Sequence, residues 1–153
     1  MGVKIATVAT SIAGLSVSGV TLKDISTIPE SVTQRQCPVM FPDPAGFVTG
    51  LTITRESMGG DSFAAKNVTY TLNYIYLHCE VGTVRYMTDA IDTMVDKAVL
   101  ILNAIANNSA VSGSVDIDPS LPGEFGVLED PAGNQFFGCR VSVSVTEFYE
   151  VSA

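Results

Sequence analysis

The chain has 153 residues, of which 46% are hydrophobic and 16% are charged, so it suits one domain with a substantial apolar core. Its 8 basic residues oppose 16 acidic ones, which gives a net charge of −8. Proteins grip nucleic acid with clustered Lys and Arg, so this balance argues against tight DNA binding, although not against an acidic surface that DNA passes without sticking. The low charge favours self-association, with a monomer of Ser/Thr-rich surface as the alternative.

The first part of the chain predicts one short helix and two short strands. Apolar residues at helical spacing indicate a helix over Val3–Ala13, which Gly14 ends. Val20–Ile25 is expected to be a short strand, and Gln36–Phe41 a second one. Since Pro38 cannot donate to a ladder, the second strand is expected at a sheet edge, or Pro38 at its start.

Two longer stretches are typical of a β-hairpin. Phe47–Glu56 and Lys66–Cys79 have strand patterns, and the glycines of Met58–Ser62 favour a turn between them. The hairpin is longer than a core needs, so its tip is expected to project. We predict that charged residues at the tip contact a neighbouring subunit or partner: Arg55, Glu56, Asp61 and Lys66.

An amphipathic helix is expected to begin near Arg85, with Thr83 as its N-cap, and to end at Asn107-Asn108. Apolar residues recur there every three or four positions, which predicts a stripe wide enough to pack on a sheet. The stripe comprises Met87, Ala90, Ile91, Met94, Val95, Ala98, Ile101, Leu102 and Ile105.

The last part of the chain predicts further strands. Val111–Ile117 is expected to be a short strand, Asp118–Gly123 a loop and Asp130–Asn134 a tight turn. From Cys139 to Thr146 apolar and polar residues alternate strictly, which indicates a strand with one buried face. The whole pattern predicts an α+β fold in a single domain, residues 1–153: a two-layer sandwich of a mostly antiparallel sheet packed by one long and one short helix, with a long β-hairpin.

Cysteine usage and hydropathy indicate a soluble, intracellular protein. Cys37, Cys79 and Cys139 are odd in number and far apart in sequence, so buried thiols are expected, not disulfides or a zinc site. The N-terminal segment lacks the pattern of a signal peptide, and no apolar run is long enough to span a bilayer.

His78, the single histidine, is the first candidate for chemistry. Catalysis would need a nearby nucleophile and an orienting carboxylate, and the adjacent Cys79 is expected on the opposite strand face. A structural histidine is therefore favoured over a catalytic one.

The segment from Asp116 to Asp130 is acidic, and Asp116-Ile117-Asp118 is weakly similar to the start of a calcium loop. The following Pro119 and the spacing do not fit that motif, so a solvated acidic loop is favoured.

Three tyrosines of one strand, Tyr70, Tyr74 and Tyr76, could stack on bases. With few basic residues nearby, packing against helices or another subunit is favoured. No catalytic, metal-binding or cofactor-binding residue is predicted.

The order of these features resembles the tail terminator (tail completion, neck) proteins of long-tailed bacteriophages. The resemblance covers nearly the whole chain and lies in architecture and pattern, with a longer acidic segment than that family's pattern. The stretches that carry it are Cys37-Pro38-Val39-Met40-Phe41, the strand Val68-Thr69-Tyr70-Thr71-Leu72-Asn73-Tyr74-Ile75-Tyr76-Leu77, the helix opening Arg85-Tyr86-Met87-Thr88-Asp89-Ala90 and the strand Arg140-Val141-Ser142-Val143-Ser144-Val145.

The resemblance implies a structural virion protein, not an enzyme. It would form a ring, commonly a hexamer, that caps the tail tube, ends its polymerisation and joins the head connector. Its partners would be other copies of itself, the tail tube protein and connector proteins, with DNA passing through the lumen. It would be assembled in the host bacterial cytoplasm and located in the virion neck or tail. The alternatives are another head–tail or tail tube ring component, or a small-molecule-binding or enzymatic α+β domain using His78, Cys79 or the acidic segment.

Overall fold

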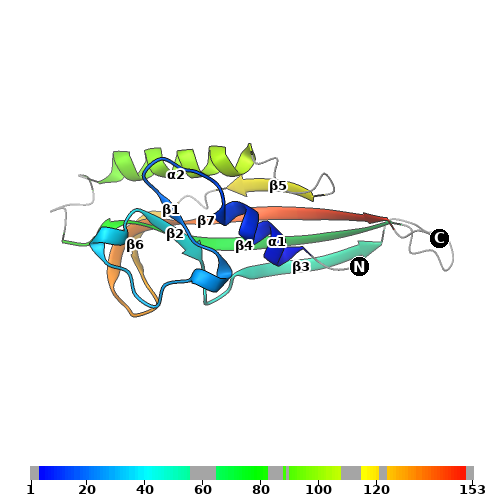
Figure 1. Ribbon diagram of the computed structural model, residues 1–153, viewed down its shortest axis with the longest axis horizontal. Coiled ribbons are helices and arrows are strands. Elements are labelled where there is room, and N and C mark those ends of the chain that lie inside the picture. Colours follow the sequence, from blue (N-terminus) through cyan, green and yellow to red (C-terminus); the bar gives the residue numbers. More distant parts are fainter. Residues whose placement is uncertain are drawn as a thin grey trace.

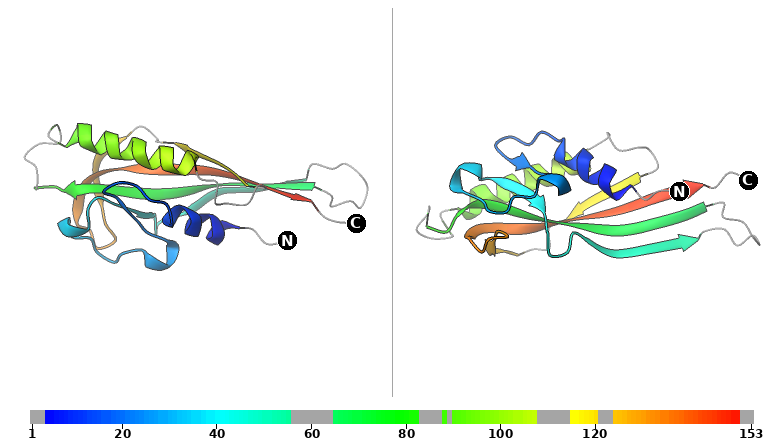
Figure 2. Two further views of the ribbon diagram at one scale, coloured as in Figure 1. Left: turned by 45° about the horizontal axis from the view of Figure 1, so that its top comes forward. Right: turned by 60° about the horizontal axis from the view of Figure 1, so that its bottom comes forward.

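A computed structural model describes residues 4–55, 65–82, 88, 90–107, 115–120 and 124–150. The fold is mixed α/β, with two α-helices and a strongly curled seven-stranded sheet (Figures 1 and 2). The elements are α1 (Ile5–Ala13), β1 (Thr21–Leu22), the 3₁₀ turns Ile25–Thr27 and Gln34–Gln36, β2 (Val39–Pro42), β3 (Val48–Arg55), β4 (Ala65–Glu80), α2 (Ile91–Ala106), β5 (Val115–Ser120), β6 (Phe125–Glu129) and β7 (Gln135–Glu150).

The antiparallel pair β4–β7 forms the middle of the sheet, from Ala65 opposite Glu150 to Glu80 opposite Phe136. Along one half of this pair, β3 lies beside β4 and β5 lies beside β7. Along the other half, β2 lies beside β4, with β1 beyond it, and β6 lies beside β7. All these pairs are antiparallel except β1–β2.

The larger core lies between one face of the sheet and both helices. Strand alternation puts Val68, Tyr70, Leu72, Tyr74 and Tyr76 of β4 on this face, where all are buried. The residues that pack with them are Val8 and Ile12 of α1, Met94, Ala98, Ile101 and Ile105 of α2, and Cys139, Val141, Val143 and Val145 of β7. The alternating pattern predicted for the last strand is therefore confirmed. The predicted stripe of the long helix is buried at Ala90, Met94, Ala98, Ile101 and Ile105 and half-buried at Ile91, Val95 and Leu102, while Met87 lies outside the described residues.

A smaller core covers the opposite face at one end of the sheet. Its members come from the segment after β1 and from three strands: Val32, Val39, Phe41, Ile75, Leu77 and Phe136. Asp130, in the turn between β6 and β7, holds this segment in place because its Oδ2 accepts a 2.7 Å hydrogen bond from the Val32 amide.

The long helix begins later than predicted. Ala90 is its N-cap and Ile91 its first residue, so Thr83 does not cap it. Apolar spacing continues upstream of Ile91, but the first main-chain bond of the helix runs from Met94 N to Ala90 O, at 2.9 Å. Its end at Asn107 is as predicted.

Several strand predictions need correction. The second strand begins at Val39 and not at Gln36, because Gln34–Gln36 forms a 3₁₀ turn. The first strand is only Thr21–Leu22, because Asp24 caps a 3₁₀ turn that follows it. Asp118–Ser120, predicted as loop, belongs to β5, where Pro119 is tolerated because the strand pairs only with β7 in the described part of the chain. Phe125–Glu129 is a strand that the sequence analysis missed. The short first helix and the turn at Asp130–Asn134 are as predicted.

Glu147 is a buried carboxylate on the apolar face of β7, with 1% of its surface exposed. It continues the inward alternation of Val143 and Val145 and reaches the start of α1, where both its oxygens accept from the Lys4 amide, at 2.9 and 3.1 Å. The Tyr70 hydroxyl also donates to it. A carboxylate at a helix N-terminus satisfies an otherwise unpaired amide and suits the helix dipole, so Glu147 joins α1 to the sheet.

The close approach of β4 and β7 at one point requires a glycine. The register shifts between Leu77 and Cys79, opposite Gly138. A Cβ on Gly138 would lie 2.0 Å from the Tyr76 carbonyl oxygen, which belongs to the backbone and cannot move aside.

We predict that Gly138→Ala lowers the free energy of unfolding by about 1–3 kcal/mol, as overpacking does. Gly126, the direct cross-strand partner of Gly138, has open space at its Cβ position and is the matched control. Gly126→Ala should leave stability unchanged or raise it by up to about 1 kcal/mol. Chemical denaturation checks both variants, and equal stability of the two would contradict the close approach.

Candidate interaction surface

The residues singled out as candidates for chemistry are mostly held in structural contacts. The Tyr76 hydroxyl lies 2.7 Å from His78 Nδ1, and the Thr93 hydroxyl lies 3.0 Å from His78 Nε2. Because Thr93 Oγ1 already donates to the Ala90 carbonyl, it accepts from Nε2–H, and Nδ1 accepts from Tyr76. His78 is thus a neutral link between β4 and α2.

The pKa of His78 is lowered from its ordinary 6.5, first by burial and second by the charge of Lys97. The unfolded chain therefore binds a proton more readily than the folded chain. As a result, stability is complete above pH 6.5 and falls as the pH drops below it.

We predict that the free energy of unfolding decreases between neutral pH and about pH 5, and that His78→Gln flattens this dependence. Denaturant titrations across this range measure it. A slope that is the same in the variant and in the original chain would show that His78 does not couple folding to protonation.

The three cysteines do not present a thiolate at neutral pH. Burial is the main cause that raises the thiol pKa of Cys37 and of Cys139 to about 12, and it also raises the pKa of Cys79. Cys79 and Cys139 are buried and Cys37 is half-buried, all as free thiols. The three tyrosines considered for base stacking are at most 2% exposed, so their rings cannot stack on bases, and the packing role favoured for them is the one the structure has.

The acidic residues are spread over several elements. Asp116 and Asp118 are exposed on β5, and Glu124 and Glu129 are exposed around β6. Asp130 is buried; its burial acts to raise its pKa, but hydrogen bonds from Asn134, Val32 and Ala132 outweigh this effect and hold the pKa below its usual value. Among the described residues, no group of three His, Cys, Asp or Glu could hold a metal ion.

The predicted contact residues of the hairpin tip are only partly described. Arg55 and Lys66 pair directly across β3 and β4 at the end of the ladder. Glu56 and Asp61 lie outside the described residues, as does the whole connection 56–64.

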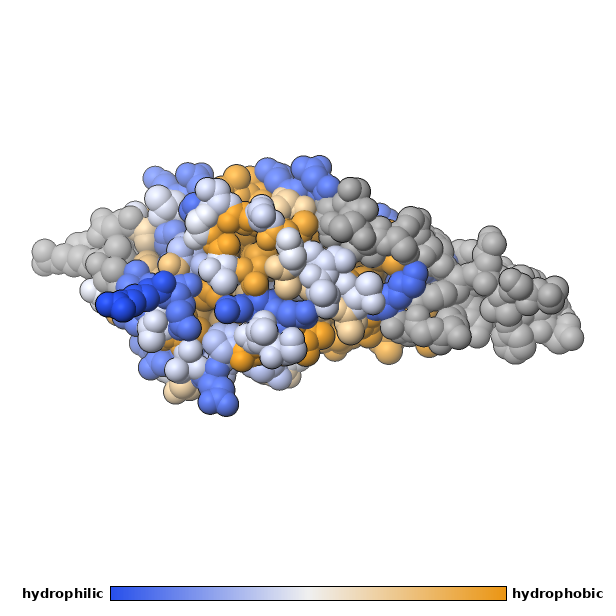
Figure 3. Space-filling model, viewed as in Figure 1, coloured by the Kyte–Doolittle hydropathy of each residue, from blue (hydrophilic) through white to orange (hydrophobic). Residues whose placement is uncertain are grey.

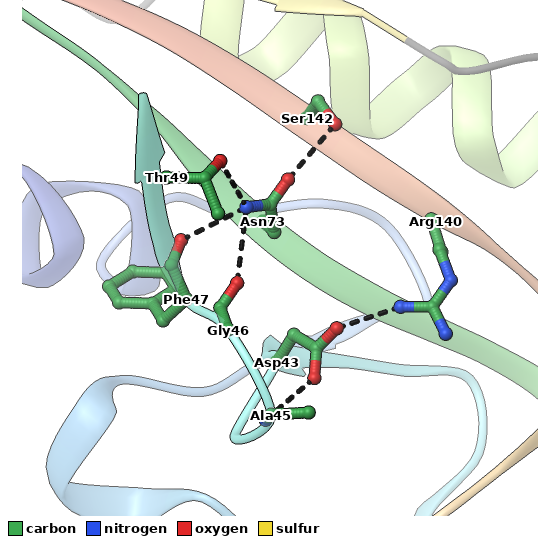
Figure 4. Close-up of polar contacts among 8 residues, drawn as sticks. All are labelled: Asp43, Ala45, Gly46, Phe47, Thr49, Asn73, Arg140 and Ser142. Carbon is green, nitrogen blue, oxygen red and sulfur yellow. Dashed lines mark hydrogen bonds and ion pairs between the residues drawn. The ribbon is translucent and has the colours of Figure 1, made fainter. Parts of the chain in front are cut away.

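A polar network that the sequence analysis missed joins the β2–β3 loop to the central strands (Figure 4). The Asn73 side-chain amide donates to the Gly46 carbonyl at 3.1 Å and to Thr49 Oγ1 at 3.0 Å. Asp43, 7% exposed, accepts from the Ala45 amide and pairs with Arg140 of β7 at 2.7 Å. An aspartate between two prolines, in Pro42-Asp43-Pro44, indicates a turn but does not reveal its distant partner.

Three cross-strand rows on one face of the β3–β4–β7–β5 half of the sheet carry hydroxyl, amide and carboxylate side chains only. Cross-strand rows place Thr52, Thr69, Thr146 and Asp116 side by side, and likewise Thr49, Thr71, Ser144 and Asp118. The third row contains Asn73, Ser142 and Ser120. We call these residues the polar face; each is half-buried or exposed, and its only charges are the two aspartates of β5.

This half of the sheet also ends in two strand edges that pair with nothing in the described part of the chain. β3 pairs only with β4, and β5 only with β7 (Figure 2, right). Both edges lie at the same level, because Val48–Ile53 of β3 and Val115–Pro119 of β5 flank the same stretch of β7, Val143–Glu147. Free edges are templates for pairing with another chain.

Comparison with known proteins assigns no function to this surface, because no protein-family model and no curated protein matches the sequence of the chain. No helix in the described part of the chain combines the length and apolar character needed to cross a bilayer.

Proposed function

We propose that this chain is a ring-forming structural protein of a bacteriophage tail, of the tail terminator type. Copies would close into a ring, hexameric by resemblance to that family, which caps the tail tube, ends its polymerisation and binds the head connector. In this proposal the fold is a two-layer α+β sandwich whose β3–β4 hairpin projects, with its tip as a further contact. The protein would be assembled in the host cytoplasm and located in the virion neck.

The observation that carries the proposal is the pair of free edges at one level of a continuous antiparallel sheet. β3 runs antiparallel to β4, β4 to β7, and β7 to β5, so β3 and β5 of one copy run in opposite directions. A second copy can therefore join by β3 against β5 and keep the antiparallel alternation. Joining unlike surfaces head to tail generates rings when the rotation closes.

The polar face supports the passage of DNA through such a ring. Lys and Arg would bind phosphates and retain DNA, whereas the polar face offers neutral hydroxyls and the two negative charges of Asp116 and Asp118. A surface of this kind repels the phosphate backbone weakly and makes few lasting contacts.

We predict that the purified protein assembles into closed rings. Light scattering after size exclusion should show a species of several times the 16.1 kDa chain mass, near six copies, and electron microscopy should show an open centre. Mixed with phage tail tubes that lack their own terminator, the protein should bind one tube end. A monomer at every concentration that also ignores tube ends would contradict the proposal, and binding along the tube wall would indicate a different tail component.

A further inference from the structure

We propose that β3 of one copy pairs antiparallel with β5 of the next, and that Leu51 and Ile53 of β3 then pack beneath the outer flank of α2 above β5. This inference rests on the proposed assembly of copies into a ring. It names the two surfaces that meet.

β3 carries two apolar residues that a single subunit leaves exposed to water, so they contribute little to the stability of the subunit. Leu51 and Ile53 are 53% and 56% exposed, and Ile53 pairs with Val68, which belongs to the helix-covered face. Ile53 therefore lies on the side of the sheet where a neighbouring α2 would stand, and strand alternation from Ile53 puts Leu51 on the same side. Figure 3 shows apolar side chains also reaching the surface among polar ones on the helix side of the molecule.

The orientation of α2 is fixed by its contacts. Lys97 Nζ donates to the Ser18 carbonyl at 2.7 Å, and Thr93 contacts His78 of β4, so this flank of the helix faces α1 and β4. Residues of an α-helix are about 100° apart, which puts Val95 and Val99 about 160° from Lys97, and Leu102 about half a turn from Thr93.

The opposite flank of α2 therefore faces outward on the side of β5, which the C-terminal end of the helix approaches (Figure 1). Val99 there is 44% exposed, and Val95 and Leu102 are half-buried. A β3 strand added to the free edge of β5 would bring Leu51 and Ile53 to this flank. Apolar surface exposed on both sides would then be removed from water.

The charges favour β3 against β5 over β5 against β5. Two β5 strands side by side would set Asp116 and Asp118 of one copy beside those of the other, and like charges directly opposite are destabilising. From Val48 to Ile53, β3 presents no charge, so the β3–β5 contact avoids this repulsion.

Disulfide trapping between variants that each carry one exposed cysteine, with Cys79 and Cys139 left buried, tests the proposal. In a Cys37→Ser background, Thr52→Cys on β3 is mixed in turn with Asp116→Cys, Asp118→Cys and Ser120→Cys on β5, one partner carrying a mass tag. All four positions are exposed on the polar face, so none disturbs the core. We expect a mixed disulfide dimer with at least one β5 position under mild oxidation by glutathione disulfide, and little dimer when either variant is oxidised alone. The bond forms between two thiols while the oxidant is reduced to two glutathione thiols.

Ser144→Cys is the matched control, because Ser144 is exposed on the same face but belongs to the interior strand β7. It should form several-fold less mixed dimer with Thr52→Cys. A dimer of Thr52→Cys alone, or equal trapping by Ser144→Cys, would overturn the proposal.

The controls also separate this inference from the proposed ring. If light scattering gives the mass of a ring but no β3–β5 disulfide forms, the edge pairing is rejected and the proposed ring is retained. A Leu51→Asp variant provides a second readout: it should shift the oligomer toward monomer with an unchanged unfolding transition of the subunit, and rings of normal mass from this variant would contradict the packing under α2.

Discussion

The β4–β7 ladder is the constraint on which the rest of the structure depends. Each strand has 16 residues, and every other strand except β1 pairs directly with one of the two. At about 3.3 Å per residue these strands span roughly 50 Å, whereas the 16-residue helix α2 spans roughly 24 Å. Helices of this length cannot cover the whole sheet, and the exposed Leu51 and Ile53 of β3 are a consequence.

Buried polar groups attach the other segments to this ladder at defined places. Glu147 holds the start of α1, Asp43 with Arg140 holds the β2–β3 loop, and Asp130 holds the segment around Val32. A buried carboxylate that lost its donors would be strongly unfavourable, so each of these groups selects one arrangement of its segment. None of these contacts covers the outer edge of β3 or β5, and in the described part of the chain neither edge pairs with another strand.

Local patterns in the sequence predicted which segments form helices and strands better than they predicted which segments contact each other. The alternation from Cys139 to Thr146 and the stripe Met94–Ile105 each report one buried face, and the structure has both. The start of α2 was wrong because apolar spacing does not show where main-chain bonding begins. β6 was missed because Gly126 and exposed Val127 interrupt its pattern, and the predicted strand Val111–Ile117 stopped two residues before Pro119, which β5 includes. The contacts of Glu147, Asp43 and Asn73 join residues up to 143 positions apart, which no local pattern can reveal. The free edges, too, follow from strand order and not from composition.

Edge strands become protected only when another chain pairs with them, so amide hydrogen exchange tests the central claim most directly. Exchange should be compared peptide by peptide between dilute protein and concentrated protein. The account predicts slower exchange on assembly in β3 and β5, with β1 and β6 unchanged as edge strands of the same sheet. Protection confined to β1 or β6, or no protection at any concentration, would contradict assembly through the edges of β3 and β5.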